Sequence, residues 1–221
     1  MRGRGRSEPI ESGKPPTLVA MNLHDQLGPI DIYLFDQVMK GRFEPGMSLL
    51  DAGCGGGRNL VYFLRNGYQV FGVDENAEAV SQVRHLAARL APDLPASSFQ
   101  VSDLAEIPFP DESFDAVVCS AVLHFARDEA HFERMLDEMW RVLKPGGLFF
   151  ARLASTIGLE GRVTLLQGRR YHLPDGSERF LVDEAMLTRA TGRLAASWAE
   201  PLKTTLVQNL RSMTTWVLWK T

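Results

Sequence analysis

The main part of the chain begins with a short apolar run that ends in a glycine-rich turn. Residues 47–50 are mostly apolar and lead directly into 51–57, which holds one acidic residue and four glycines. This pattern predicts a buried strand followed by a tight turn. Apolar residues then recur at helical spacing over 60–64, and Gly67 ends that predicted helix. Strand, glycine loop and helix form the first unit.

The alternation of strand and helix continues to about residue 153. Asn76 is placed to cap an amphipathic helix that ends before Pro92. Asp128 is likewise placed to cap a helix with apolar residues on one face, and the turn Lys144-Pro145-Gly146-Gly147 is expected to end it. The predicted strands cover 69–74, 98–101, 114–119 and 148–153.

Five strands that alternate with helices are typical of a doubly wound α/β fold, with parallel strands and helices on both faces. Ligands of such folds bind at the carboxyl ends of the strands. The end of the chain departs from this pattern. After a helix predicted near 183–191, two β-rich runs, 202–209 and 212–219, are joined by a two-residue link. We expect a terminal hairpin with an antiparallel strand, and hence a mostly parallel sheet of seven strands.

Three segments lie outside this alternation. Residues 18–46 have apolar positions that suit a short amphipathic helix, and we expect this region to cover the core. Residues 154–182 are polar and glycine-rich, and connections of such length are often functional, so we expect an insertion that frames the substrate pocket. Residues 1–17 are expected to form a flexible basic tail, and 18–221 a single domain.

Composition excludes several classes of protein. In 221 residues, 24 basic residues stand against 27 acidic ones, and the net charge of -3 gives no general attraction for nucleic acid. The Arg-Gly alternation of the tail leaves an RNA or protein acceptor as an alternative. Cys54 and Cys119 cannot build a disulfide framework, and their spacing resembles no zinc site. With no apolar run of membrane-spanning length, we expect a soluble cytoplasmic protein without a metal site, whose oligomeric state stays open.

The glycine loop and a later acid form a generic nucleoside-binding pattern. The glycines of 53–57 let backbone approach a ligand closely, and Asp74, at the end of the second predicted strand, can accept hydrogen bonds from ribose hydroxyls. Dinucleotide-binding enzymes use nearly the same plan. Asp51 discriminates, because a carboxylate before the first glycine repels a pyrophosphate and suits a cationic amino-acid or sulfonium ligand. Arg58 also stands where the dinucleotide motif has its third glycine.

The loop Leu49-Leu50-Asp51-Ala52-Gly53-Cys54-Gly55-Gly56-Gly57-Arg58-Asn59 resembles motif I of the class I S-adenosylmethionine-dependent methyltransferases. Further landmarks of that family follow in order: Val73-Asp74, Ser102-Asp103-Leu104, the stretch from Phe114-Asp115-Ala116-Val117 to Leu123-His124-Phe125, and Arg141-Val142-Leu143-Lys144-Pro145-Gly146-Gly147. The resemblance covers about residues 47–153. It implies a Rossmann-like methyltransferase domain with S-adenosylmethionine as its cofactor.

The resemblance also implies roles for individual residues. Asp51 and the backbone of Gly53 to Gly55 would hold the methionine moiety, Asp74 the ribose hydroxyls, and Asp103 the adenine amino group beside the Leu104 amide. Ser120 would line the cofactor near its methionine end. Each acid has a structural alternative, as a helix cap or a turn residue. The expected cofactor set is completed by Cys54, Arg58, Asn59, Glu75 and Ser102.

Methyl transfer from a sulfonium is an in-line displacement in which positioning supplies much of the rate, so no catalytic residue is obligatory. Sequences typical of amino-methylating DNA and glutamine enzymes, of catechol-type magnesium sites and of cytosine-C5 methylation do not occur. A small-molecule acceptor is therefore expected. The exit of the fourth predicted strand resembles the group that contains ubiquinone/menaquinone and tellurite-resistance methyltransferases.

Candidate residues on the acceptor side are few. His124 could act as a base, with a packing role as the alternative. Arg152 and the cations of the insertion, among them Arg179, could meet an anionic acceptor or simply be surface charges. Two other functions stay open: a noncatalytic binding or regulatory module that keeps the methyltransferase fold, and an NAD-dependent oxidoreductase.

Overall fold

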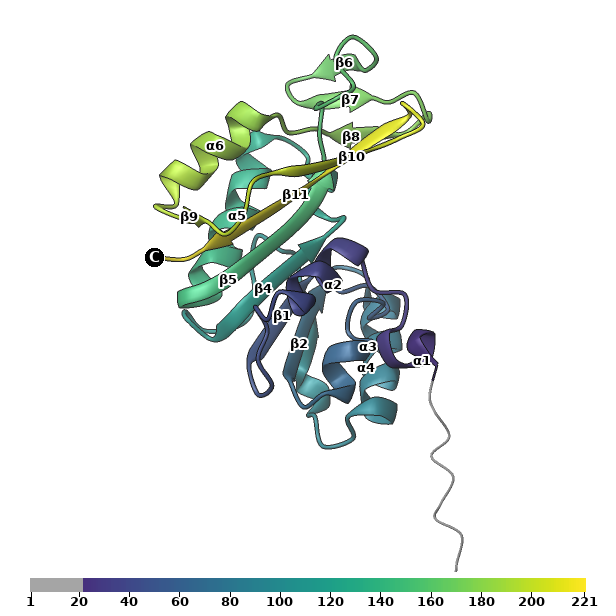
Figure 1. The fold of residues 1–221 in the computed structure, drawn as a ribbon, viewed down its shortest axis with the longest axis vertical. Coiled ribbons are helices and arrows are strands. Elements are labelled where there is room, and N and C mark those ends of the chain that lie inside the picture. The colour runs from purple at the N-terminus through teal and green to yellow at the C-terminus, as the bar shows by residue number, and fades with distance from the viewer. Residues whose placement is uncertain (1–21) are drawn as a thin grey trace, which may run out of the picture.

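The structure is a computed structural model that describes residues 22–221, so the expected tail at 1–17 lies outside the described residues. Seven strands form the main path of its central sheet: β1 (Ser48–Ala52), β2 (Gln69–Asp74), β3 (Phe99–Val101), β4 (Phe114–Ser120), β5 (Leu143–Ala154), β10 (Lys203–Val207) and β11 (Arg211–Trp219). Their spatial order is β10-β11-β5-β4-β1-β2-β3 (Figure 1).

The sheet is parallel from β3 to β5 and antiparallel at the other edge. Strands β1 to β5 pair in parallel, whereas β11 runs antiparallel to β5 and β10 antiparallel to β11. A two-residue strand, β9 (Ser197–Trp198), also pairs with β11. The predicted doubly wound, mostly parallel sheet with a terminal hairpin is therefore confirmed.

Helices cover both faces of the sheet. The helices are α1 (Leu23–Leu27), α2 (Ile32–Met39), α3 (Val61–Arg65), α4 (Ala77–Leu90), α5 (Glu129–Val142) and α6 (Glu184–Arg193). Adjacent strand residues point to opposite faces. Leu49 and Phe150 therefore join a buried cluster with α2, α3 and α4, while their neighbours Leu50 and Phe149 join a cluster with α5 and α6. None of the described helices is long and apolar enough to cross a bilayer.

The helices begin at the polar residues that the sequence marks. The Asn76 side chain accepts hydrogen bonds from the backbone N–H groups of Glu78 and Ala79 at the start of α4. Asp128 caps α5 and Asp183 caps α6 in the same way. These caps satisfy N–H groups that have no partner inside the helix, which explains why the predicted starts agree with the structure.

The turn after α5 is built differently from the prediction. The helix ends at Val142, but β5 begins at once and includes the expected turn as a bulge, because Phe114 pairs with Leu143 and Ala116 already pairs with Leu148. The chain end stabilises this bulge. Gly146 N–H donates to the Lys220 carbonyl at 2.7 Å, and Lys220 N–H donates to the Gly147 carbonyl at 3.0 Å.

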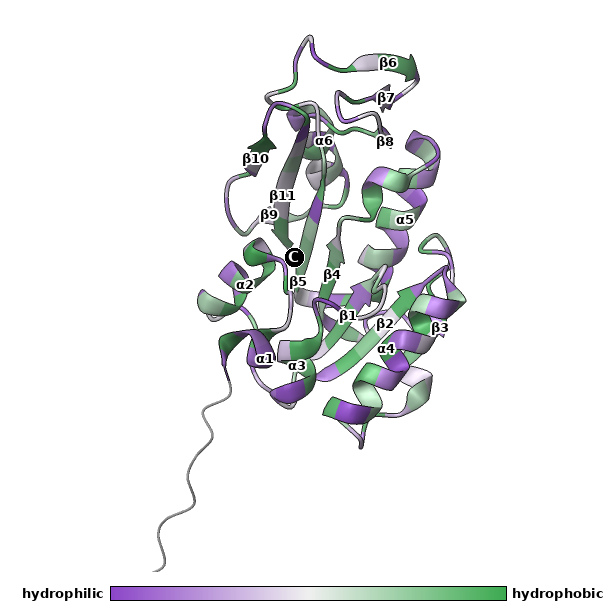
Figure 2. Ribbon diagram, turned by 90° about the vertical axis from the view of Figure 1, so that its right-hand side faces the viewer, coloured by the Kyte–Doolittle hydropathy of each residue, from purple (hydrophilic) through white to green (hydrophobic). Residues whose placement is uncertain are grey.

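Two of the three segments outside the predicted alternation lie in the described residues, and both form regular structure. The helix expected in 18–46 is α2, and α1 is an additional short helix before it. The insertion at 154–182 contains a small antiparallel sheet of β6 (Thr164–Gln167), β7 (Arg170–His172) and β8 (Glu178–Phe180). Figure 2 shows this small sheet at the far end of the molecule from α1.

Candidate active site

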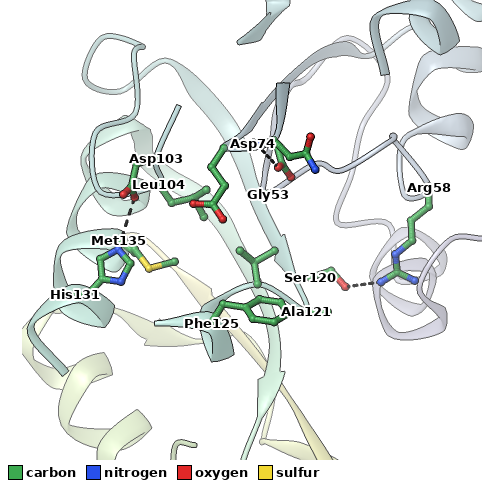
Figure 3. A pocket seen from close by; sticks show the side chains of 13 residues that line it. Gly53, Arg58, Asp74, Asp103, Leu104, Ser120, Ala121, Phe125, His131 and Met135 are labelled. Atoms are coloured by element: carbon green, nitrogen blue, oxygen red, sulfur yellow. Dashed lines mark hydrogen bonds and ion pairs between the residues drawn. The ribbon is translucent and has the colours of Figure 1, made fainter. Parts of the chain in front are cut away.

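A cavity of about 440 Å³ opens at the carboxyl ends of β1, β2 and β4. In Figure 3, Asp103, Leu104 and His131 lie on one side of it, and Arg58 with Ser120 lies on the other. Parallel strands place their following loops at one edge of the sheet, which is where ligands bind in this architecture. The cavity therefore lies where the sequence predicts a ligand.

The first wall of the cavity is the glycine loop after β1. The backbone N–H groups of Gly53 and Cys54 both donate to the Val73 carbonyl, at 2.8 and 3.0 Å, so the loop is fixed to the end of β2. Gly53 has φ +83, and a Cβ there would lie 2.3 Å from Cγ2 of Val122. Glycine is required at this position both for its backbone conformation and for space.

Asp74 lines the cavity next to this loop. Its Oδ2 accepts from Gly55 N–H at 2.8 Å, and its Oδ1 accepts from Asn76 N–H at 2.9 Å. A carboxylate offers about four acceptor sites, so each oxygen can still accept a further hydrogen bond. Asp74 is thus both a support of the glycine loop and an oriented acceptor; its neighbour Glu75 also lines the cavity.

Asp103 and Leu104 form the opposite wall. Asp103 Oδ1 accepts from Ala105 N–H at 2.8 Å. This hydrogen bond and the nearby His131 and Arg127 lower the pKa of the Asp103 carboxyl, so it is ionised at neutral pH. His131 Nε2 lies 3.6 Å from Asp103 Oδ1. Sequence reasoning missed His131, whose only signal is its position four residues before Met135 on the α5 face that lines the cavity.

Asp51 is buried behind the cavity rather than on its surface. It belongs to β1 itself, where it pairs with Gly72 of β2 and Val118 of β4. Its Oδ2 is buried and has no hydrogen-bond partner among residues 22–221. Burial raises the pKa of the Asp51 carboxyl to about 8, although the Arg58 charge opposes this shift and Asp74 adds to it. A carboxyl in such surroundings is stabilised as an anion by a cation or a hydrogen-bond donor that comes close to it.

Arg58 and Ser120 start a hydrogen-bonded chain that the sequence did not predict. Arg58 Nη2 donates to Ser120 Oγ at 3.4 Å, and that hydroxyl donates to Asp31 Oδ2, also at 3.4 Å. The same Asp31 oxygen accepts from Arg152 Nη1 at 3.1 Å. The chain connects the glycine loop, β4, the start of α2 and β5.

The remaining members of the expected cofactor set have different surroundings. Cys54, Gly55 and Asn59 line an adjoining cavity of about 380 Å³, which shares Gly53, Arg58 and Ser120 with the main one. Burial raises the pKa of the Cys54 thiol, so it stays protonated. Asn59 Oδ1 accepts from Asp31 N–H at 3.0 Å and so holds the start of α2. Ser102 does not line the main cavity; its hydroxyl donates to the Glu106 carbonyl at 2.6 Å.

His124 lies at a second, smaller cavity of about 270 Å³. Burial, and then the charges of Arg179 and Arg152, lower the pKa of its ring to about 4, so it is neutral at pH 7. Its Nδ1 accepts from Ala154 N–H at 3.4 Å, which leaves the hydrogen on Nε2. In this tautomer Nε2 carries the hydrogen, so it can donate a hydrogen bond but cannot take up a proton. The expected role as a base would need the other tautomer.

Ala121 separates the two cavities and is strained. It lines both of them and has φ +65. For a residue with a Cβ this conformation costs about 1–2 kcal/mol. Its N–H donates to the Arg152 carbonyl at 2.7 Å, which holds the chain in this turn directly after β4. Backbone strain of this kind is common at functional sites.

Comparison with known proteins agrees with this geometry. Residues 50–151 match the family model described as a methyltransferase domain. The matched range contains Asp51, the glycine loop, Asp74, Asp103 and the end of β4. This part of the chain is a methyltransferase domain of the class I S-adenosylmethionine-dependent type. Among residues 22–221, no group of three or more His, Cys, Asp or Glu side chains is arranged to hold a metal ion.

Proteins similar to this chain are known from several bacteria. Over 173 residues it is 31% identical to a probable S-adenosylmethionine-dependent methyltransferase of Mycobacterium tuberculosis, which covers 75% of this chain and 57% of that protein. It is 31% identical to a demethylmenaquinone methyltransferase of Symbiobacterium thermophilum over 140 residues, 62% of this chain and 54% of that protein. The chain spans about half the length of the curated relatives it matches.

Solved structures share the fold. A methyltransferase of Methanosarcina mazei superposes with a TM-score of 0.68 at 21% identity, covering 83% of this chain and 96% of that one. The 1,6-didemethyltoxoflavin-N1-methyltransferase of Burkholderia thailandensis superposes with a TM-score of 0.65 at 19% identity, covering 85% and 76%. The predicted Rossmann-like methyltransferase architecture is thereby confirmed.

Proposed function

We propose that this protein transfers a methyl group from S-adenosylmethionine to a small-molecule acceptor. The observation that carries the proposal is the set of three carboxyl groups at the carboxyl ends of neighbouring strands. Asp74 and Asp103 line one cavity from opposite sides, and Asp51 lies buried behind it with an unpartnered oxygen. Anionic cofactors such as dinucleotides would be repelled here, whereas a ligand with a cationic end and a nucleoside fits.

The residues present suit each part of that cofactor. The buried Asp51 oxygen is suited to a cationic ammonium. The glycine loop lets a ligand come close to its backbone. Asp74 has free acceptor sites for ribose hydroxyls, and Asp103 for an exocyclic amino group next to the buried Leu104. When bound, the cofactor supplies a methyl group on a positively charged sulfur.

The protein's own part in the reaction is positioning. The Arg58, Ser120 and Asp31 chain fixes the wall of the cavity where the methionine end is expected. Ala121 and Phe125 border the opening toward the second cavity, where an acceptor can align with the methyl group. Neutral His124 is placed to donate a hydrogen bond to the acceptor. No proton-accepting side chain is needed for an acceptor that is already nucleophilic.

Names of relatives support a small acceptor without naming one. They include a demethylmenaquinone methyltransferase, a fatty-acid O-methyltransferase and a sterol 24-C-methyltransferase. These acceptors differ in size and in the atom methylated, so we assign none of them to this protein. The two buried free cysteines, Cys54 and Cys119, support a reducing cytosol as the location.

Calorimetric titration with S-adenosylhomocysteine, S-adenosylmethionine and NAD tests the cofactor. We expect micromolar binding of the first two and none of NAD. Asp74→Asn should weaken S-adenosylhomocysteine binding by about tenfold or more, because charge-assisted hydrogen bonds are lost. Asp93→Asn, exposed in the turn after α4, is the matched control and should leave binding unchanged.

Two results would contradict the proposal. Tight binding of NAD without S-adenosylhomocysteine binding would make the protein an oxidoreductase. Binding of S-adenosylmethionine without transfer of its labelled methyl group to any member of a panel of quinones, phenols, thiols and carboxylic acids would favour a noncatalytic module.

A further inference from the structure

We propose that the second cavity binds an anionic group of the acceptor, a carboxylate or a phosphate, through Arg152, Arg179 and Arg211. This inference rests on the proposed function, because it assigns the substrate class of the same site. The cavity measures about 270 Å³ and shares Ala121 with the larger cavity. An acceptor held in it therefore lies next to the place proposed for the cofactor.

A direct contact connects the two cavities. Phe125 lines the larger cavity, and the Arg179 guanidinium, which lines the smaller one, lies 4.9 Å from the centre of the Phe125 ring. The flat face of an aromatic ring attracts a cation and orients it. Arg179 is thus held at the boundary between the two sites rather than free on the surface of β8.

The three arginines come from three different strands and are incompletely paired. Arg179 and Arg211 form no ion pair with any residue between 22 and 221. Arg152 pairs with Asp31 at 3.1 Å, but its buried Nε has no partner in the described part of the chain. Buried donors without a partner are costly, and a planar guanidinium is suited to the two oxygens of a carboxylate or phosphate.

The charge of the cavity is positive. Its one acidic lining residue is Asp175, whose carboxylate accepts from the hydroxyl and N–H of Ser177 at 2.6 and 3.0 Å. These hydrogen bonds lower the Asp175 pKa and keep it ionised. Asp31 and Asp175 together offset two of the three guanidinium charges. One cation is left for an anionic ligand.

The remaining residues that line the second cavity indicate what the uncharged part of the ligand should be. Ala154, Leu173, Val207 and Met213 give the cavity an apolar wall, and the neutral His124 ring adds a donor without a charge. An acceptor with a small apolar or aromatic body and one anionic group suits this combination.

Other arginines of the insertion do not share this arrangement. Arg170 pairs with Glu178 at 3.4 Å, and Arg169 pairs with Asp183 at 3.0 Å. Neither lines the second cavity. Arg170 is therefore a matched control, because it is an arginine of the same small sheet whose charge already has a partner.

The test compares matched probes in the presence of saturating S-adenosylhomocysteine. The pairs are 4-hydroxybenzoate against 4-hydroxybenzamide, and phenyl phosphate against phenol, with dissociation constants from calorimetry. We expect the anion of at least one pair to bind about tenfold or more tightly than its neutral partner, and the better pair distinguishes carboxylate from phosphate. The preference should disappear in the double variant Arg179→Gln/Arg211→Gln and persist in Arg170→Gln. Thermal melting should show that both variants fold.

The inference is overturned if neither anion is preferred by the wild-type protein, or if the preference survives in the double variant. S-adenosylhomocysteine affinity, measured for the same proteins in a separate titration without the probes, separates the two proposals. The double variant should bind it as the wild type does. A wild type that fails to bind it contradicts the proposed function, whereas the anion preference stands or falls on the arginines alone.

Discussion

The two sides of the active site are built in different ways. On the cofactor side, Asp74 and Asp103 are oriented by backbone close to them in sequence: Asp74 accepts from Asn76 N–H and Asp103 from Ala105 N–H. On the acceptor side, Arg152, Arg179 and Arg211 meet only because β5, the insertion and the terminal hairpin come together. The first side depends on local backbone geometry, and the second depends on tertiary assembly.

The difference has a consequence for tolerance to mutation. A loop fixed by backbone hydrogen bonds and close packing has little freedom, since an atom added at Gly53 or Gly57 meets a packed side chain. A cavity framed by side chains from separate strands can change its charge without disturbing the fold. Specificity can therefore change on the acceptor side while cofactor binding is kept.

Gly53→Ala and Gly176→Ala compare the two sides at almost the same backbone angle, φ +83 and φ +84. A Cβ at Gly53 would lie 2.3 Å from Val122 Cγ2, whereas nothing lies within 4 Å of one at Gly176. We expect Gly176→Ala to lower the free energy of unfolding by about 1 kcal/mol from strain alone. Gly53→Ala should lower it by about 4 kcal/mol, because overpacking is added to strain, and should abolish S-adenosylhomocysteine binding.

Urea unfolding and calorimetry measure both effects. Adding Val122→Ala to Gly53→Ala removes the clashing atoms and should recover part of the lost stability, which separates crowding from strain. Equal losses of unfolding free energy in Gly53→Ala and Gly176→Ala would mean that the glycine loop is no more constrained than the turn between β7 and β8.

The same contrast explains what the sequence could predict. The strand at 69–74 agrees with β2 residue for residue, and Asn76 and Asp128 cap the helices they were expected to cap, because each signal lies within a few residues of the structure it determines. Asp51, by contrast, was expected at the turn and belongs to β1, where strands on both sides bury it.

Contacts between distant residues had no readable signal. Asp31 and Arg152 are 121 residues apart, and no periodicity connects them. The positive φ of Ala121 could not be predicted either, because glycine is the residue that usually indicates such a conformation and alanine is not. For the insertion, the sequence predicts only a polar connection, whereas the structure has the short strands β6, β7 and β8 there. The individual roles of the cofactor residues stay predictions until ligands are titrated.

Asp51→Asn tests the buried carboxyl on the cofactor side. The folded pKa of Asp51 is about 8, against an ordinary value of 3.8. Between these values the folded protein holds one proton more than the unfolded chain, so the contribution of Asp51 is present at low pH and is lost as pH rises toward 8. Removing the group should flatten the fall in unfolding free energy by about 1.4 kcal/mol per pH unit, or ~3 kcal/mol between pH 5 and 7.

Urea unfolding of wild type and Asp51→Asn without ligand, at pH 5, 6 and 7, measures this slope. Asp115→Asn is the control: contacts with Lys144 and Ser48 hold the pKa of Asp115 below its ordinary value, so its ionisation is complete in this range and the slope should not change. Parallel plots of unfolding free energy against pH for wild type and Asp51→Asn would contradict this prediction, because they would show that Asp51 is already ionised in the folded protein.

Asp31 joins the two sides, and its variants should have the smallest effects. It caps α2 through Tyr33 N–H at 2.9 Å and also pairs with Arg152. Asparagine can keep the cap, so Asp31→Ala should be less stable than Asp31→Asn by about 1 kcal/mol in urea unfolding. Asp31→Asn also frees the Arg152 charge and should tighten 4-hydroxybenzoate or phenyl phosphate binding several-fold while S-adenosylhomocysteine binding stays the same. If Asp31→Asn changed S-adenosylhomocysteine affinity instead, Asp31 would act through Ser120 and belong to the cofactor side. Anion binding in the acceptor cavity would then depend on Arg179 and Arg211 alone.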